Sequence, residues 1–302
     1  MQHYVGCSGW SYTSWKGPFY PSNLEKAKWL NYYSQIFDYV EIDSSFYRTP
    51  SVFMVKNWSK RTPKNFRFTA KFPKVITHDK RLKNVDKELE LFFQVIDPLK
   101  SKTLALLIQL PPSLMISQGL EGLRQLLPTL DNTGFRYAVE VRHNSWFQDL
   151  AYNFFTDNNI CMVWSQLANI RTPPIVTTDF LYIRFIGDRS IQERDFGSIQ
   201  KDKISEMRKW ARNLKAVSKQ ETGAEEEGEA IMRRGRKNNI NLAIVAANNH
   251  YAGFGPGTAN LFRSVVGLPQ ATLGENKQDL IQERDLKQST LSDFIINKEY
   301  NE

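Results

Sequence analysis

LALLI at residues 104–108 and LAIVAA at residues 242–247 are apolar at every successive position. A strand with one face in water alternates apolar and polar residues, so an unbroken apolar run indicates a strand that is covered on both faces. Such strands are typical of parallel sheets, whose crossover helices pack on the outer face. These two segments therefore predict a parallel α/β fold.

Similar runs recur along the whole chain, with helix-like stretches between most of them. Eight strands are predicted, at residues 4–7, 39–43, 66–72, 103–110, 136–142, 160–165, 180–187 and 241–249. Ser22 and Glu25 have capping-box spacing and predict a helix start, whereas Pro173 and Pro174 leave little room for a helix within 166–178. This alternation predicts a single (β/α)8 TIM-type barrel. The alternative is an open doubly wound sheet, but GCSGW at 6–10 lacks its G-x-G-x-x-G phosphate turn.

Two regions lie outside the repeating pattern. The segment 221–237 joins an acidic block to a basic block and is predicted to be a charged loop inserted before the last strand. We assign the barrel to residues 1–268. Residues 269–302 are then a polar tail that packs on the barrel or is partly disordered.

Composition limits the class of protein. Of the 302 residues, 41% are hydrophobic and 24% charged, which excludes wholesale disorder. No apolar run is long enough for a membrane span, and the N-terminal residues do not resemble a signal peptide. Cys7 and Cys161 fall on the first and sixth predicted strands, so we expect two free thiols in a cytoplasmic protein. The net charge of +8 is spread along the chain and only weakly favours an anionic partner.

Charged residues interrupt several of the apolar strands. Glu41, Lys71, Glu140, Arg142 and Arg184 lie where burial without a partner would cost several kcal/mol. They are therefore predicted to form one inward-facing cluster near the C-terminal ends of the strands, where barrel enzymes place their active sites. A structural ring of ion pairs is the alternative. We take the first four as candidate catalytic residues.

Polar and aromatic residues at the ends of the strands supply candidate substrate-binding groups. In a barrel these positions meet at one mouth, so we predict that they surround the charged cluster. The candidates are Ser8, Trp10, Trp15, Tyr47, His78, Gln109, His143, Trp146, Tyr182, Arg184, Asn248 and Asn249. The aromatic rings Trp10, Trp15, Tyr47 and Trp146 are predicted to be stacking walls.

The order of these motifs resembles the YecE-like family, also called domain of unknown function 72. The resemblance covers about residues 4–268 and rests on GCSGWSY (6–12), Trp15, FYP (19–21), EIDSSFY (41–47), Trp58, TP (62–63), Phe68 with Lys71, TH (77–78), QLPP (109–112), EVRH (140–143) with Trp146, Tyr182 with Arg184, and NN (248–249). It implies a TIM-type barrel and names site residues, but it implies no reaction. The chain departs from the family at Ser165, where an aspartate is usual, and at Ile186, where a histidine is usual.

Several functions fit these residues. The first is an enzyme for a phosphate- or carboxylate-bearing, nucleotide-like substrate, with Lys71, Arg142 and Arg184 as anion clamp and Glu41 or Glu140 as general acid or base. Hydrolase, lyase and isomerase classes stay open, and no cofactor is identified. The alternatives are a divalent-metal phosphoesterase or isomerase, a glycosidase that pairs Glu41 with Glu140, and a non-catalytic nucleic-acid-binding module. The metal ligands would come from Glu41, His78, Glu140, His143 and His250.

Overall fold

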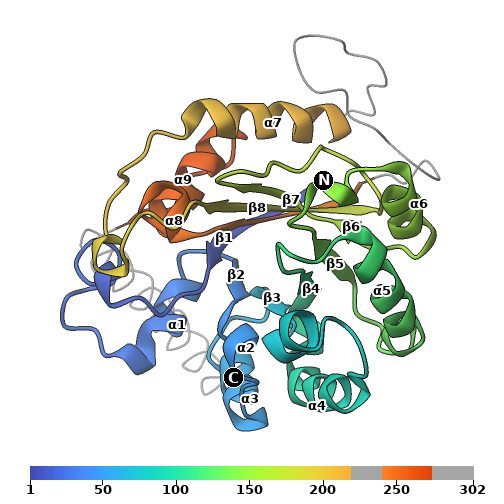
Figure 1. Cartoon of the computed structure of the whole chain (residues 1–302). Helices are drawn as coiled ribbons and strands as arrows, with labels where there is room; N and C mark the ends of the chain where they lie inside the picture. The colour runs from blue at the N-terminus through green and yellow to red at the C-terminus, as the bar shows by residue number, and fades with distance from the viewer. Residues whose placement is uncertain (219–239, 274–302) are drawn as a thin grey trace, which may run out of the picture.

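Parallel strands form a barrel surrounded by helices in the computed structural model, which describes residues 1–218 and 240–273 (Figure 1). The strands are β1 (Gln2–Ser8), β2 (Tyr39–Ile42), β3 (Arg67–Lys71), β4 (Thr103–Gln109), β5 (Tyr137–Glu140), β6 (Cys161–Met162), β7 (Trp164–Leu167), β8 (Phe180–Gly187) and β9 (Leu242–Ala247). The sheet order is β6-β5-β4-β3-β2-β1-β9-β8-β7, and every pairing is parallel.

The two end strands of this sheet are parts of one strand position. Only Val163 separates β6 from β7 in the sequence, yet β6 pairs with β5 whereas β7 pairs with β8. Together they occupy the sixth position and bring the two ends of the sheet to each other. The predicted TIM-type barrel is therefore confirmed, with all eight predicted runs contributing strands.

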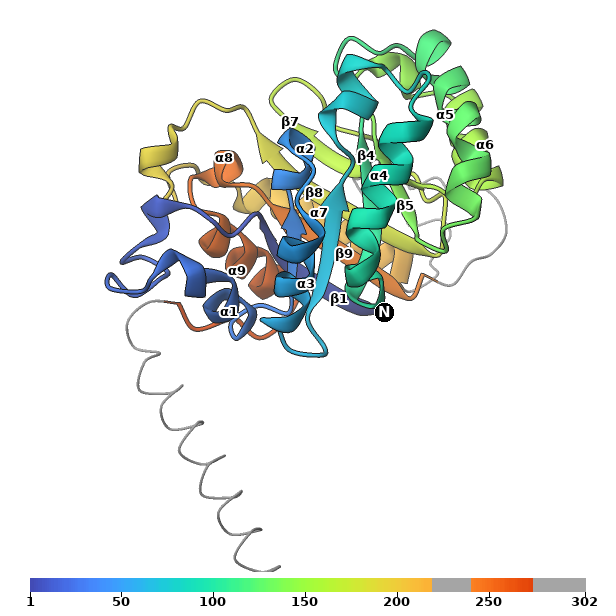
Figure 2. The same cartoon turned by 90° about the horizontal axis from the view of Figure 1, so that it is seen from below.

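Helices pack around the outside of the strands (Figures 1 and 2). They are α1 (Trp29–Ser34), α2 (Ser44–Tyr47), α3 (Val52–Lys60), α4 (Asp86–Ile96), α5 (Ile116–Asp131), α6 (Asp149–Asp157), α7 (Ile204–Ser218), α8 (Asn249–Ala252) and α9 (Gly255–Val265), with short turns of helix at Thr13–Trp15, Lys26–Lys28, Val75–Asp79, Asp97–Lys102, Asn144–Trp146 and Glu193–Asp195. None of the helices in the described ranges is long and apolar enough to cross a membrane.

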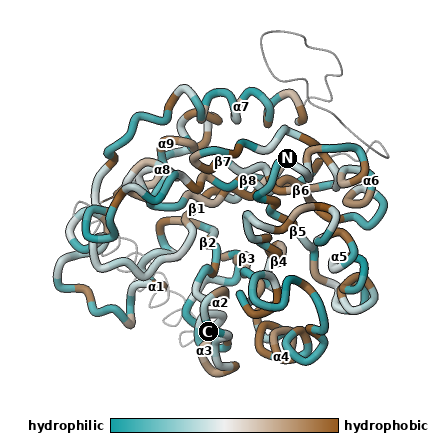
Figure 3. The backbone as a smooth tube through the Cα atoms, viewed as in Figure 1, coloured by the Kyte–Doolittle hydropathy of each residue, from teal (hydrophilic) through white to brown (hydrophobic). Residues whose placement is uncertain are grey.

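Apolar side chains fill two layers, one inside the barrel and one between strands and helices. The inner layer includes Tyr39, Leu107, Cys161, Tyr182 and Ile244. The outer layer is larger and takes in the buried faces of the amphipathic helices. Figure 3 shows the corresponding colouring, with apolar segments on the central strands and mixed segments on the surrounding helices. Both cysteines are buried and free, as predicted.

Three local expectations are wrong. The last strand, predicted over 241–249, spans Leu242–Ala247, because the Asn248 side chain accepts from the His250 amide and caps α8. The helix predicted to start at Ser22 starts at Trp29 instead, because the Leu24 amide donates to the Pro21 carbonyl in a turn and the Trp29 indole holds the Leu24 carbonyl. The strand predicted to reach Arg142 ends at Glu140, opposite the last residue of β4. The segment 168–179 contains no helix, as Pro173 and Pro174 indicated.

The charged insertion at 221–237 lies outside the described residues, as does the tail from residue 274 onward. Its first residues, 269–273, follow α9. There the side-chain amide of Asn260 both donates to the Ala271 carbonyl and accepts from the Ala271 amide.

Candidate active site

Glu41, on β2, is the centre of a buried hydrogen-bond network. Its Oε1 accepts from the Ser8 hydroxyl at 2.5 Å and from Arg184 Nη2 at 2.7 Å. Its Oε2 accepts from the Tyr182 hydroxyl at 2.5 Å and from Arg184 Nε at 2.8 Å. A carboxylate offers about four lone-pair positions, so these four donors saturate Glu41.

Arg184, on β8, joins Glu41 to Glu140. Its Nη1 donates to Glu140 Oε2, and the other Glu140 oxygen accepts from Arg142 Nε at 2.5 Å. Lys71 Nζ lies 3.3 Å from Glu41 Oε1. The five charged side chains thus form one inward-facing cluster, as predicted, built from β2, β3, β5, β8 and the residue two beyond β5.

The carboxylates of this cluster are held in the ionised form. Burial acts to raise the pKa of Glu41, but the charges of Arg184 and Lys71 and the hydrogen bonds outweigh it and leave the pKa well below its usual range. The pKa of Glu140 is lowered in the same way by Arg142 and Arg184. General acids and bases need a pKa near the working pH, so this geometry does not favour either glutamate for proton transfer.

A cavity of about 660 Å³ lies over the cluster, at the ends of the strands. Lys71, Arg142 and Arg184 border it from below, and the segment after β8 borders it from the side. The full lining is Tyr12, Asp43, Tyr47, Lys71, Gln109, Arg142, Arg184, Ile186, Arg189, Ile191, Gln192, Glu193, Phe196, Asn248 and His250. This volume suits a small molecule and not a macromolecule as a whole.

Asp43, directly after β2, borders the cavity, and its carboxyl group accepts from the Tyr12 hydroxyl and not from an arginine. Burial raises its pKa above the usual value, and the charge of Lys71 offsets this only in part. The Tyr12 hydroxyl lies 3.2 Å from Asp43 Oδ2 and 3.0 Å from the Ser8 carbonyl oxygen. Gly9, at φ +83°, makes this turn, and a Cβ there would lie 2.8 Å from the Tyr12 hydroxyl. Asp43 is thus a better proton-transfer group than Glu41 or Glu140.

Six of the predicted site residues border the cavity, namely Tyr47, Lys71, Gln109, Arg142, Arg184 and Asn248. Four more of the predicted residues lie beneath the cavity floor. Ser8, Tyr182, Glu41 and Glu140 form the layer beneath, where the Tyr182 hydroxyl also meets Tyr39 at 3.0 Å and Thr69 at 2.7 Å.

Three of the four aromatic rings that were predicted to be stacking walls do not border the cavity. Trp15 and Trp146 have 0% exposure, and their indoles donate to Asn249 Oδ1 at 3.0 Å and to the Leu114 carbonyl at 2.8 Å. Both rings, and with them Asn249, hold the loops together and do not contact the cavity. Trp10 packs edge-on against Trp58, with ring centroids 5.5 Å apart. Of the four predicted rings, Tyr47 borders the cavity, and it is 75% exposed.

His78 and His143 are also absent from the cavity lining. His78 Nδ1 lies 2.8 Å from the Thr77 hydroxyl, and burial together with the positive charges of Arg142 and Lys74 lowers its pKa to about 4. His143 Nδ1 accepts from the Ser145 amide at 3.1 Å. Within residues 1–218 and 240–273, no three His, Cys, Asp or Glu side chains are grouped so that they could hold a metal ion.

Sequence reasoning missed much of the rim. Tyr12 and Asp43 stood in the recognised motifs but were not selected, although Asp43 directly follows a predicted strand. Residues Arg189, Ile191, Gln192, Glu193 and Phe196 come from the long segment after β8, which carried no pattern. Lys201 holds this segment by pairing with Asp188 at 2.6 Å.

The two departures from the family pattern fall at the site. Ser165 is the register neighbour of Arg184, and its buried hydroxyl has no hydrogen-bond partner among the described residues. Ile186 borders the cavity. An aspartate at 165 would add a carboxylate beside Arg184, so its absence leaves this cluster more positive.

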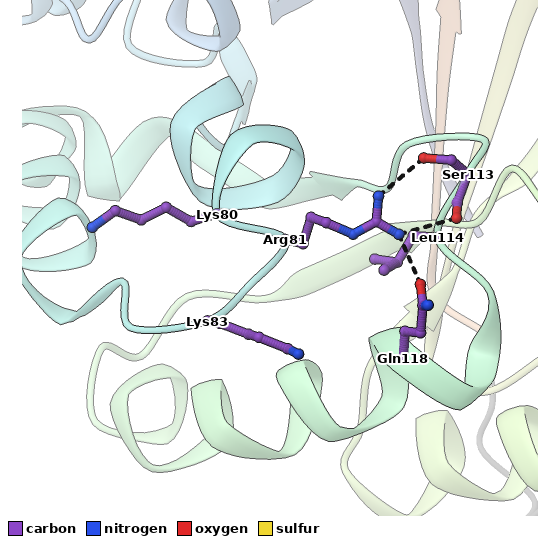
Figure 4. A pocket seen from close by; sticks show the side chains of 6 residues that line it. All are labelled: Lys80, Arg81, Lys83, Ser113, Leu114 and Gln118. Atoms are coloured by element: carbon purple, nitrogen blue, oxygen red, sulfur yellow. Dashed lines mark hydrogen bonds between the residues drawn. The ribbon is translucent and has the colours of Figure 1, made fainter.

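A second cavity, of about 460 Å³, lies beside the start of α5 and is lined by Lys80, Arg81, Lys83, Ser113, Leu114 and Gln118. Figure 4 shows the Arg81 guanidinium between Ser113 and Gln118, with hydrogen bonds to the Ser113 hydroxyl, the Ser113 carbonyl and Gln118 Oε1. The Lys80 amine points away and pairs with Glu88 at 2.7 Å. Arg81 thus ties its own loop to the loop before α5 and to the first turn of that helix.

Comparison with known proteins agrees with the resemblance in the sequence. A family model described as "Protein of unknown function DUF72" matches residues 4–282. The UPF0759 protein YecE of Escherichia coli K12 is 31% identical over 144 residues, which are 48% of this chain and 50% of that protein. The UPF0759 protein YunF of Bacillus subtilis is 32% identical over 156 residues, 49% of this chain and 54% of that protein. The chain thus matches about half the length of these curated relatives.

Solved structures show the same fold. The crystal structure of a DUF72 family protein from Thermotoga maritima matches with a TM-score of 0.71 at 27% identity, over 88% of this chain and 100% of that one. A DUF72 family protein from Enterococcus faecalis matches with a TM-score of 0.66 at 21% identity, over 89% and 98% of the two chains, and is a likeness of fold alone.

Proposed function

We propose that this chain, which belongs to the DUF72 family, is an enzyme that binds a small phosphate- or carboxylate-bearing substrate in the cavity at the end of its barrel. The observation that carries the proposal is a pair of cationic side chains on the cavity lining, Lys71 and Arg142, that keep hydrogen-bond donors free among the described residues. Lys71, Arg142 and Arg184 face Glu41 and Glu140, and both carboxylates are already hydrogen-bonded.

Arg142 and Lys71 are the donors left for a ligand. Arg142 uses Nε to bind Glu140, and within the described residues its two terminal nitrogens have no hydrogen-bond acceptor. These two nitrogens form the flat fork that suits a carboxylate or phosphate group. Arg184 already donates hydrogen bonds to Glu41 and Glu140, so in this proposal it holds the cluster together and does not bind the ligand.

The rim adds polar groups around the same space. Gln109 and Asn248 supply amide groups, Arg189 adds a positive charge, and Tyr47 and Phe196 add aromatic surface. A few polar groups converging on one cavity are typical of small-molecule sites. Asp43, with its raised pKa, is the proposed general acid or base, in place of Glu41 or Glu140.

Thermal denaturation with anions tests this proposal. Wild-type protein is melted with and without phosphate, pyrophosphate, glycolate and citrate, at constant ionic strength. A ligand at 100 times its Kd stabilises the folded state by about 2.7 kcal/mol, so a binding anion raises the melting temperature measurably.

Two variants locate the effect. Arg142→Met is expected to abolish the shift. Arg136→Met is the matched control, because Arg136 precedes the other end of β5 and is exposed. It is expected to keep the shift. Anion shifts of equal size in both variants would contradict binding in the cavity and leave only general effects of surface charge.

A further inference from the structure

Lys71 stands out among the described residues as a buried lysine without hydrogen-bond acceptors. It is the last residue of β3, its side chain is 10% exposed, and it belongs to the cavity lining. The nearest carboxylate oxygen, Glu41 Oε1, is 3.3 Å away, but Glu41 is saturated by Ser8, Tyr182 and Arg184. The Lys71 amine therefore lies near the negative charge of Glu41, whose lone pairs are already taken by other donors.

The other buried lysine in the described residues shows what a structural role looks like. Lys102 Nζ donates to the Ser59 carbonyl at 2.8 Å, the Thr62 carbonyl at 2.8 Å, the Thr62 hydroxyl at 3.1 Å and the Pro63 carbonyl at 2.9 Å. These acceptors satisfy its ammonium group away from the cavity. Lys71 differs because it has no such set of acceptors among the described residues and lines the cavity in which a ligand would lie.

The backbone fixes the position of Lys71. Its carbonyl oxygen accepts from the Ser45 hydroxyl at 2.8 Å, and the amide of the next residue, Phe72, donates to the Leu107 carbonyl at 2.9 Å. A reactive group needs such a rigid base, because small displacements at a reacting centre cost much of the rate.

The electrostatic surroundings make the Lys71 amine easier to deprotonate than the amine of an exposed lysine. Burial lowers the pKa of Lys71, and the charge of Arg184 lowers it further, against the opposing charges of Glu41, Asp43 and Glu140. A lysine that is desolvated or next to another cation is the usual form of an activated amine nucleophile.

We propose that Lys71 forms an imine with the carbonyl carbon of an anionic aldehyde or ketone substrate whose phosphate or carboxylate rests on Arg142. The inference deepens the proposed function and rests on it. It narrows the substrate class to small carbonyl compounds that carry one anionic group.

The chemistry balances within the site. The Nζ lone pair attacks the carbonyl carbon, and the carbonyl oxygen takes up a proton to give a carbinolamine. The nitrogen loses its second proton, the C–O bond breaks, and the oxygen leaves as water while the C=N bond forms. Asp43 borders the same cavity and is the group proposed to carry protons between nitrogen and oxygen. No electron transfer is involved.

Reductive trapping tests the proposal. The full-length protein is incubated with glyoxylate, pyruvate or dihydroxyacetone phosphate in the presence of sodium cyanoborohydride, which converts an imine to a stable secondary amine. Intact mass and peptide mapping then give the number and position of adducts. The lowered pKa of Lys71 raises its neutral-amine fraction above that of an exposed lysine, and the probe is held beside it in the cavity, so the adduct at Lys71 is expected to be the dominant one.

Variants separate this reaction from random labelling. Lys71→Arg and Lys71→Met should lose the dominant adduct, with circular dichroism confirming that they are folded. Lys74→Met is the control, because Lys74 pairs with Asp79 at 2.9 Å and does not border the cavity. It should retain the adduct. Arg142→Met should slow labelling by the anionic probes more than labelling by uncharged propanal.

The outcomes are distinguishable from those of the anion-binding test. Adducts spread over exposed lysines, with no excess at Lys71 in the wild-type protein, would overturn the imine proposal. If phosphate still raised the melting temperature of the wild type but not of Arg142→Met, the proposed function would stand without imine chemistry. If both measurements failed, both proposals would fall together.

Discussion

Replacing Arg184 with methionine removes the side chain that joins the two buried glutamates. Methionine is unbranched and fills much of the same space, so the main change is the loss of charge and hydrogen bonds. Arg184 donates twice to Glu41 and once to Glu140. After the substitution Glu41 keeps Ser8, Tyr182 and the nearby Lys71, whereas Glu140 keeps Arg142.

The expected cost follows from what remains buried. Removing one partner of a buried ion pair costs about 3–5 kcal/mol, because an uncompensated charge stays behind. Here two carboxylates lose a partner, so we expect a loss near the upper end, about 5 kcal/mol. Whole domains are stable by about 5–15 kcal/mol, so the variant should be close to unfolding at 25 °C.

Two further variants show that charge is responsible. Adding Glu41→Gln and Glu140→Gln to Arg184→Met removes the two carboxylate charges that lost Arg184 and leaves Lys71 and Arg142, which border the cavity, so the triple variant should regain about 2 kcal/mol or more. Arg142→Met alone should cost only about 1–2 kcal/mol, because Glu140 keeps Arg184 and Arg142 faces the cavity.

Urea denaturation followed by circular dichroism measures these differences, with equal slopes as the test that the transitions are comparable. If Arg184→Met cost less than about 1 kcal/mol, or if the triple variant were less stable than the single one, the reasoning about the buried network would be refuted.

Three smaller predictions concern other parts of the barrel. The pKa of His78 is lowered to about 4, so between pH 6.5 and pH 4 the unfolded chain binds a proton that the folded chain does not bind. Stability should therefore fall as the pH is lowered toward 4, and it should fall less steeply in His78→Asn. Equal profiles of urea midpoint against pH for the two proteins would contradict this. Burial raises the pKa of the Cys7 thiol and of the Cys161 thiol, the latter to about 12, so a thiol reagent at pH 8 should leave both unmodified in the native protein. After unfolding without reductant the reagent should count two thiols, whereas a count of zero would indicate a disulfide. A Cβ at Gly6 would lie 2.1 Å from the Tyr39 carbonyl oxygen, so Gly6→Ala should cost about 1–3 kcal/mol, and an unchanged melting temperature would show that β1 and β2 can move apart.

The barrel could be predicted because its strands carry a strong local signal. Runs such as 104–108 and 242–247 can be buried only between two layers, and eight of them leave few alternatives. Helix starts were harder to predict. Ser22 and Glu25 have the right spacing for a capping box, but the turn at 21–24 and the indole of Trp29 decide where α1 begins. Tertiary contacts of this kind leave no trace in a short window of sequence.

The cluster could be predicted for a similar reason, and the rim could not. Burying a charged residue of an apolar strand is costly unless it is paired, so Glu41, Lys71 and Arg184 can be recognised from the sequence as members of a buried cluster. Aromatic residues carry no such constraint: Trp15 and Trp146 follow strands as Tyr47 does, yet they turn into the packing between loops. The segment after β8 reaches the cavity through loop geometry that no periodicity encodes.

The central claim is that Arg142 and Lys71 receive an anion at the cavity floor. The most direct measurement is a crystal structure with tungstate, a tetrahedral dianion whose metal atom gives an anomalous signal. We predict a peak within hydrogen-bond distance, about 3 Å from oxygen to nitrogen, of the Arg142 guanidinium and Lys71 Nζ. A peak only beside Arg81 and Lys83 in the second cavity, with none at Arg142, would contradict the account.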